Sequence, residues 1–209
     1  MSEAALREPW EDLDRQREAA RFGIWIFLAT EVLFFGGLFL GYSAMRFAHA
    51  AAFAEAGRET RFWFGTGNLA LLMTSSATMT VAVRGARAGF TRMATWCLFA
   101  TALIGIAFIA AKAVEYHLDL DANLWPGPGF KLGMMPGQIF WGFYWVMTGV
   151  HAVHLTIGIV LVLRLVVLAW RGLIGLRDNP QMPVVGLYWH FVDIVWMCLY
   201  PLLYLVGRT

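Results

Sequence analysis

The chain has 209 residues, of which 59% are hydrophobic and only 14% are charged. An average soluble domain is close to half apolar and a quarter charged, so both values indicate an integral membrane protein. The formal net charge is only +2 and no long basic run occurs, which excludes an electrostatic footprint for nucleic acid. Cys97 and Cys198 lie in apolar stretches, so neither a disulfide framework nor a CxxC metal or redox motif is present.

The chain begins with a polar segment, residues 1–21, in which arginines are mixed with acidic residues. The apolar run that follows is too long for the apolar region of a signal peptide, so we predict a retained N-terminal tail.

Five apolar stretches follow the tail, and each is long enough to cross a bilayer as a helix, which takes about 20 mostly apolar residues. We predict one transmembrane domain over residues 22–206, with spans at about 22–45, 62–83, 90–111, 139–168 and 185–206. Open sheet edges cannot be satisfied in hydrocarbon, and no alternating strand pattern occurs. The predicted fold is therefore an all-α integral membrane protein, a bundle of five transmembrane helices.

The connections between the spans predict the orientation and one long loop. Lysine and arginine are more frequent in the connections on the N-terminal side. By the positive-inside rule this favours a cytoplasmic N-terminus and a C-terminus on the periplasmic or outer side. The longest connection, residues 112–138, is rich in proline and glycine, so we expect an irregular loop there.

A few polar residues lie inside the predicted spans, where a charged group costs at least about 2.5 kcal/mol on insertion scales and therefore needs a partner or a function. With a helical rise of about 1.5 Å per residue, they share one layer in the half of the membrane nearer the N-terminus. We hypothesise a hydrogen-bonded polar cluster centred on Glu31. Alternatively, these groups only join helices by hydrogen bonds. The candidate members beside Glu31 are Ser75, Ser76, His151, His154, His190 and Asp193.

The histidines allow a second interpretation, a membrane haem anchor. His151 and His154 share a helical face, and His190 could face them from another helix. The first two differ by only about 4.5 Å of rise, whereas a di-haem anchor needs histidines at two well-separated depths. We therefore expect no cofactor and no metal site in this chain.

Five sequence blocks carry a resemblance to a known family. Residues 25–38 read WIFLATEVLFFGGL, residues 148–158 read TGVHAVHLTIG, and residues 188–196 read YWHFVDIVW. Together with LLMTSSATM in the second span and KAVEY after the third, they resemble cytochrome c oxidase subunit III in family order. The resemblance is to the short, five-helix bacterial type of this haem-copper oxidase subunit.

The resemblance implies a non-catalytic core subunit of a bacterial aa3- or caa3-type cytochrome c oxidase, a multi-pass protein of the inner (plasma) membrane. It implies catalytic subunit I, subunit II and a small subunit IV as partners, with haem and copper held by those partners. The implied role is to keep proton uptake fast and the catalytic site stable during aerobic electron transport. The family's membrane-buried glutamate maps onto Glu31, and its paired histidines map onto His151 and His154.

The resemblance also implies bound phospholipid and other contacts with membrane lipids. Longer family members place seven helices around a lipid-filled cleft, and we expect this chain to correspond to the last five, so no lipid-binding residue is assigned. The alternative function is the accessory membrane subunit of nitric oxide reductase, which shares the five-helix architecture and the histidine and aspartate blocks. Glu31 within TEVLFF and the Ser/Thr run of the second span favour the oxidase. A membrane haem anchor and a small transporter are the remote alternatives.

Overall fold

The computed structural model describes residues 13–133, 135–177 and 179–208. These residues form six α-helices and no strand: α1 (Leu13–Ala48), α2 (Ala50–Arg58), α3 (Phe62–Arg87), α4 (Thr91–Asp121), α5 (Met135–Trp170) and α6 (Gln181–Tyr204). All except α2 are long and apolar enough to cross a membrane. The predicted all-α bundle of five transmembrane helices is confirmed.

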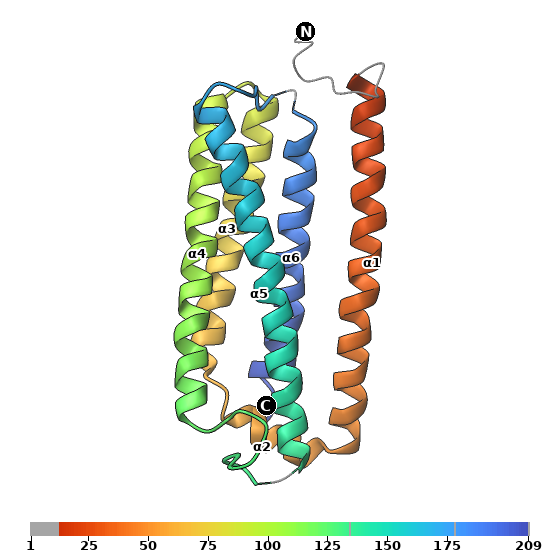
Figure 1. Cartoon of the computed structure of the whole chain (residues 1–209), viewed down its shortest axis with the longest axis vertical. Coiled ribbons are helices and arrows are strands. Elements are labelled where there is room, and N and C mark those ends of the chain that lie inside the picture. The colour runs from red at the N-terminus through yellow and green to blue at the C-terminus, as the bar shows by residue number, and fades with distance from the viewer. Residues whose placement is uncertain (1–12, 134, 178, 209) are drawn as a thin grey trace.

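Successive long helices run in opposite directions (Figure 1). The start of α1, the turn between α3 and α4, and the connection from α5 to α6 lie at one end of the bundle, which we call the N-terminal face. Helix α2 and the end of α6 lie at the opposite end, the C-terminal face. Helix α1 stands at the edge of the bundle and contacts α5 and α6, whereas α3 and α4 pack closely against each other.

The helices extend beyond the predicted spans. Helix α4 ends at Asp121, so the first ten residues of the expected irregular loop are helical and the prediction was wrong there. The predicted third span ends just before the charged residue Lys112. Helix α1 begins at Leu13, so residues 13–21 of the predicted tail belong to a helix, while residues 1–12 lie outside the described residues.

Helix α2 was not predicted as an element. It lies on the C-terminal face and buries one apolar side, on which Phe53 is fully buried. Phe53 packs edge-on against Phe140 of α5 at 5.5 Å and against Tyr42 of α1 at 5.4 Å. An aromatic contact therefore fixes this short helix beneath the first and fourth spans.

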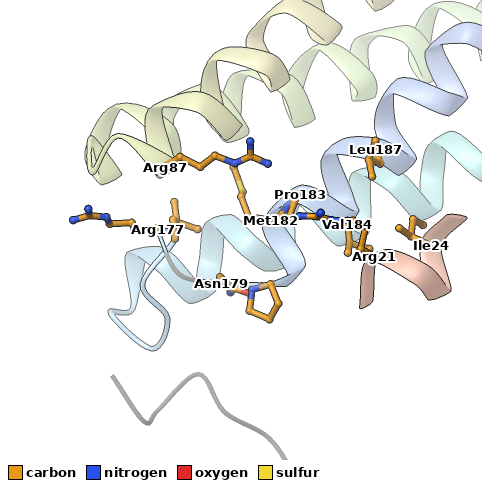
Figure 2. A pocket seen from close by; sticks show the side chains of 11 residues that line it. Arg21, Ile24, Arg87, Arg177, Asn179, Met182, Pro183, Val184 and Leu187 are labelled. Atoms are coloured by element: carbon orange, nitrogen blue, oxygen red, sulfur yellow. The ribbon is translucent and has the colours of Figure 1, made fainter. Parts of the chain in front are cut away.

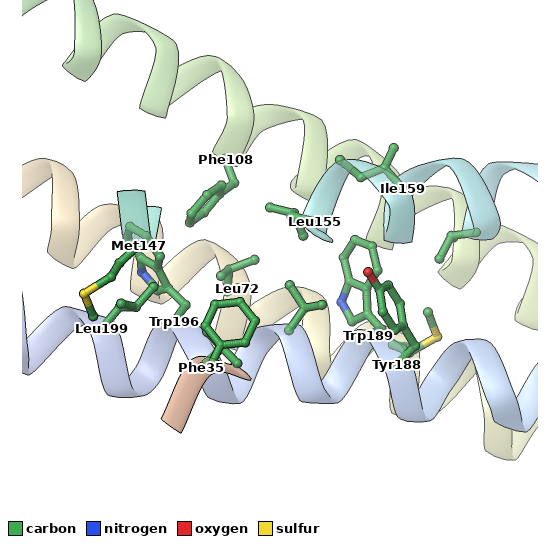
Figure 3. Packing of buried hydrophobic residues seen from close by; sticks show 14 of the residues in the cluster. Phe35, Leu72, Phe108, Met147, Leu155, Ile159, Tyr188, Trp189, Trp196 and Leu199 are labelled. Carbon is green, nitrogen blue, oxygen red and sulfur yellow. The ribbon is translucent and has the colours of Figure 1, made fainter. Parts of the chain in front are cut away.

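The centre of the bundle is filled by large aromatic side chains (Figure 3). Trp189 of α6 is fully buried, and small residues on the neighbouring helices leave room for it. A Cβ atom added to Gly105 of α4 would lie 2.8 Å from the Trp189 ring, and one added to Gly158 of α5 would lie 3.2 Å from it. Close helix approach at small residues is the usual way in which membrane bundles pack.

Candidate functional site

Glu31 of α1 forms an intramembrane pair with His154 of α5. The Glu31 Oε2 atom lies 3.0 Å from His154 Nε2, and both side chains are 16% exposed. The pair therefore lies near the edge of the bundle, and it links the peripheral helix α1 to the rest of the protein. The structure brings together the two residues that the sequence placed at one depth.

The hydrogen bonds of His154 define how many protons the pair holds. His154 Nδ1 lies 2.8 Å from the carbonyl oxygen of Val150, and a carbonyl can only accept, so Nδ1 carries a hydrogen. The Nε2–Glu31 contact then contains one more proton, either on the carboxyl of Glu31 or on Nε2 of the imidazolium. In both forms the pair is electrically neutral, which is the form that a low-dielectric medium favours.

Aromatic groups hold this pair in place. The ring of Phe35 meets the His154 ring edge-on at 5.3 Å, and the hydroxyl of Tyr188 donates to the carbonyl oxygen of His154 at 2.9 Å. Phe35 is 1% exposed. The imidazole is therefore oriented from three sides, by Phe35, by its bond to Val150 and by Glu31.

Two more predicted members, Ser75 and Ser76, form bonds between α3 and α6. Ser76 Oγ lies 2.8 Å from His190 Nδ1, and Thr80 Oγ1 lies 3.4 Å from His190 Nε2. Ser75 Oγ accepts a hydrogen bond from the indole of Trp189 at 3.2 Å. These contacts agree with the alternative that polar groups join helices.

The last two predicted members, His151 and Asp193, are buried without hydrogen bonds in the described part of the chain. The His151 ring packs against the rings of Phe108 and Trp196, with centroids at 5.6 and 5.0 Å. Within the described residues, the hydrogen bonds thus divide the hypothesised cluster into separate contacts instead of joining all its members to Glu31. Equal depth did not mean a shared interface, because His154 contacts α1 while His151 contacts α4 and α6.

Sequence reasoning missed a buried charge network near the C-terminal face. Lys112, Glu115 and Asp119 of α4 are at most 2% exposed. The Lys112 ammonium donates to Glu115 Oε2 at 3.0 Å, to the Tyr144 hydroxyl at 2.9 Å and to the Tyr204 hydroxyl at 2.7 Å. All three of its donors are therefore satisfied.

The hydroxyls of the two tyrosines in turn donate hydrogen bonds to the carboxylates. The hydroxyl of Tyr144 donates to Asp119 Oδ2 and that of Tyr204 donates to Glu115 Oε1, both at 2.8 Å. Arg61, before α3, donates to Asp119 Oδ1 at 3.3 Å. Two cations and two carboxylates balance, so the network joins α4, α5 and α6 without net charge.

A sequence signal for this network existed. Lys112, Glu115 and Asp119 are spaced at i, i+3 and i+7, which places them on one face of a helix. Opposite charges on one face can neutralise one another, so they do not have to end a span.

Within the described ranges, no group of three or more His, Cys, Asp or Glu side chains is arranged to hold a metal ion. The fold and the polar contacts instead define a class: a multi-pass membrane protein whose helices are joined by buried polar pairs. The family profile described as "Cytochrome c oxidase subunit III" matches residues 14–208. The chain belongs to this family.

The similar proteins in this family are named as subunits of ubiquinol, cytochrome c and haem-copper oxidases. "Cytochrome bo(3) ubiquinol oxidase subunit 3" of Pseudomonas aeruginosa is 28% identical over 187 residues, which cover 89% of this chain and 84% of the relative. "Cytochrome c oxidase subunit 3" of Thermostichus vulcanus is 32% identical over 193 residues, covering 89% and 87%. A third relative, "Heme-copper oxidase subunit I+III" of Aeropyrum pernix, is 30% identical over 201 residues, which cover 91% of this chain and 23% of the relative.

These findings place the chain among the subunit III proteins of haem-copper oxidases, which are accessory subunits of an oxidoreductase complex. Together with the five apolar helices, they indicate a multi-pass protein of the bacterial plasma membrane.

Proposed function

We propose that this chain is the non-catalytic subunit III of a bacterial aa3- or caa3-type cytochrome c oxidase. The observation that carries the proposal is the family match over residues 14–208, which includes all five long helices except the first residue of α1. The relative named cytochrome c oxidase subunit 3 supports cytochrome c as the electron donor of the complex. The ubiquinol oxidase relative supports the competing donor, a quinol.

The proposed partners are catalytic subunit I, subunit II and a small subunit IV, and the haem and copper reside in those partners. The relative named as a fused subunit I+III supports direct contact with subunit I, because fused segments are held at high effective concentration.

The proposed role of the chain is to support proton uptake and stability of the catalytic subunit. The Glu31–His154 pair supports this role, because it holds one transferable proton inside the membrane at a partly exposed site. Ionisable residues within transmembrane segments commonly mark proton pathways.

Purification of the native complex through an affinity tag on this chain tests the proposal. We expect subunit I to co-purify, with haem absorbance in the complex and oxygen consumption driven by reduced cytochrome c. Oxygen consumption with ubiquinol only would reject the cytochrome c type. Nitric oxide reduction without oxygen consumption would assign the chain to nitric oxide reductase, and a tagged chain without subunit I would contradict the proposal as a whole.

A further inference from the structure

Three buried polar side chains from three different helices have no hydrogen-bond partner among the described residues. They are Asn68 of α3, His151 of α5 and Trp196 of α6, and the unpaired atoms are the amide of Asn68, both ring nitrogens of His151 and the indole nitrogen of Trp196. Asn68 is 1% exposed, and the other two are fully buried. Burial of a polar group without a hydrogen bond is unfavourable, so nearly all such groups in folded proteins are paired with protein or with ordered water.

The indole of Trp196 lies beside the imidazole of His151. Their ring centroids are 5.0 Å apart and the ring planes are inclined by 37°. The ring of Phe108 from α4 packs edge-on against Trp196 at 4.8 Å (Figure 3). The two polar rings therefore share one place in the core, and they meet there by their faces and not through a hydrogen bond.

The pairing of α3 with α6 brings Asn68 to the same place. The indole of Trp189 donates to Ser75 Oγ at 3.2 Å. Asn68 lies seven residues before Ser75 on α3, and Trp196 lies seven residues after Trp189 on α6. Seven residues are close to two helical turns, and the two helices run in opposite directions (Figure 1). Asn68 therefore lies opposite Trp196.

The contact between α3 and α6 continues on the far side of Asn68. Thr66 Oγ1 lies 2.8 Å from the hydroxyl oxygen of Tyr200, so the two helices remain together through this level. Asn68 also shares its helix face with Leu72 and Ser75, at i, i+4 and i+7, and both of these are fully buried. The amide is therefore directed into the bundle and not toward lipid.

The donors and acceptors of the three side chains suit a small neutral ligand. The indole of Trp196 can only donate, whereas the amide of Asn68 and a neutral imidazole at His151 can both donate and accept. None of these groups brings a charge that would select an ion. Water both donates and accepts, and a buried water typically bonds two to four polar groups.

We propose that Asn68, His151 and Trp196 bind water inside the bundle. The site adjoins the buried charge network, because the Lys112 ammonium lies 5.6 Å from the centre of the Trp196 ring and the rings of Trp196 and Tyr204 are 6.1 Å apart. Trp196 precedes Tyr204 on α6, so the site lies nearer the middle of the membrane than the network does. The bound water joins α3, α5 and α6 and extends their polar interior toward the membrane centre.

X-ray radiolysis footprinting of the full chain in detergent tests the proposal. A short pulse converts water to hydroxyl radicals in place, so a buried side chain is oxidised where water is bound next to it. Trp189 is the internal control, because it is fully buried on the same helix as Trp196 and its indole already donates to Ser75. Oxidised peptides are quantified by mass spectrometry. We expect oxidation of Trp196 and none of Trp189.

Asn68→Leu tests the site by the sign of its effect. Leucine cannot bond water, so the variant should lose the oxidation of Trp196 and should have a lower thermal midpoint, because His151 and Trp196 are left without a partner. A dry site predicts the opposite shift, since replacing an unpaired buried amide with leucine removes its cost. Thr74→Val is the matched control, because the Thr74 hydroxyl is exposed and bonds only Ala70 of its own helix. It should change neither readout.

Three outcomes would overturn the proposal. A Trp196 as unreactive as Trp189 would show that the site is dry, and this measurement on the native chain needs no variant to fold. Equal oxidation of the two indoles would show that water enters the core without a specific site. Undiminished oxidation of Trp196 in Asn68→Leu, or a raised midpoint of that variant, would remove Asn68 from the site.

Discussion

Two contacts between an acid and a base in the described helices, Lys112–Glu115 and Glu31–His154, differ in burial and in number of partners. Lys112 and Glu115 are 2% and 0% exposed and belong to a network of six side chains. Glu31 and His154 are each 16% exposed. Apart from their contact with each other, their side chains make one hydrogen bond with the described residues, from His154 Nδ1 to the carbonyl oxygen of Val150. The first contact sits where three helices meet, and the second joins a peripheral helix to the bundle.

This difference in burial predicts different roles for the two contacts. Removing one member of a fully satisfied buried network leaves an uncompensated charge, which is strongly destabilising. A pair at the edge of the bundle can change its proton or its partner with little effect on the fold. We therefore expect variants in the network to change stability and variants in the Glu31–His154 pair to change activity.

Lys112→Met provides the largest expected effect. The variant leaves Glu115 buried without its cation, and it removes the donor to Tyr144 and Tyr204. We expect a loss of about 3 to 5 kcal/mol in unfolding free energy, measured by denaturant or thermal unfolding in detergent. Lys131→Met is the matched control, because Lys131 pairs with Glu59 at an exposed site and should lose about 0 to 1 kcal/mol. Equal losses in the two variants would remove the distinction between buried and exposed pairs.

Tyr204→Phe tests the network with a smaller change. It removes one hydroxyl, which accepts from Lys112 and donates to Glu115. We expect a loss of about 1 to 3 kcal/mol, because two buried polar groups each lose a partner. The control is Tyr200→Phe, which breaks a single bond to Thr66 and should lose about 0.6 kcal/mol, the mean for such bonds in a membrane bundle. A Tyr204 variant as stable as this control would mean that the network does not act as a unit.

Glu31→Gln should have the smallest effect on stability and a selective effect on activity. The glutamine amide can still donate to His154 Nε2, so the helix contact is kept while the transferable proton is lost. We expect a stability change below about 1 kcal/mol, intact assembly, and a slower turnover or a shorter active lifetime of the oxidase complex.

Oxygen consumption followed to inactivation measures that effect. Glu31→Leu is the comparison variant, because it removes the hydrogen bond as well as the proton. If Glu31→Gln behaves like the native chain while Glu31→Leu does not, the pair contributes through packing and not through its proton.

The sequence predicted much of the fold. Five apolar stretches predicted five helices because hydrocarbon leaves the backbone no other way to satisfy its hydrogen bonds. It also gave Glu31 and His154 as site candidates at one depth, since depth follows directly from helical rise. It did not predict helix α2. The predicted third span also ends too early, before Lys112, because the charge of Lys112 is balanced by Glu115 within the same helix.

What the sequence by itself determined is the class of the protein, its five spans and the blocks of its family, because composition and residue order act locally along each helix. What only the tertiary structure decided is which polar groups meet. The rotation of each helix about its axis sends His154 to Glu31 and His151 to Phe108 and Trp196. The same packing joins Lys112 to Tyr204 and gathers Arg21, Arg87 and Arg177 around one cavity at the N-terminal face (Figure 2). Such contacts join residues far apart in the sequence, and they depend on packing that no single segment specifies.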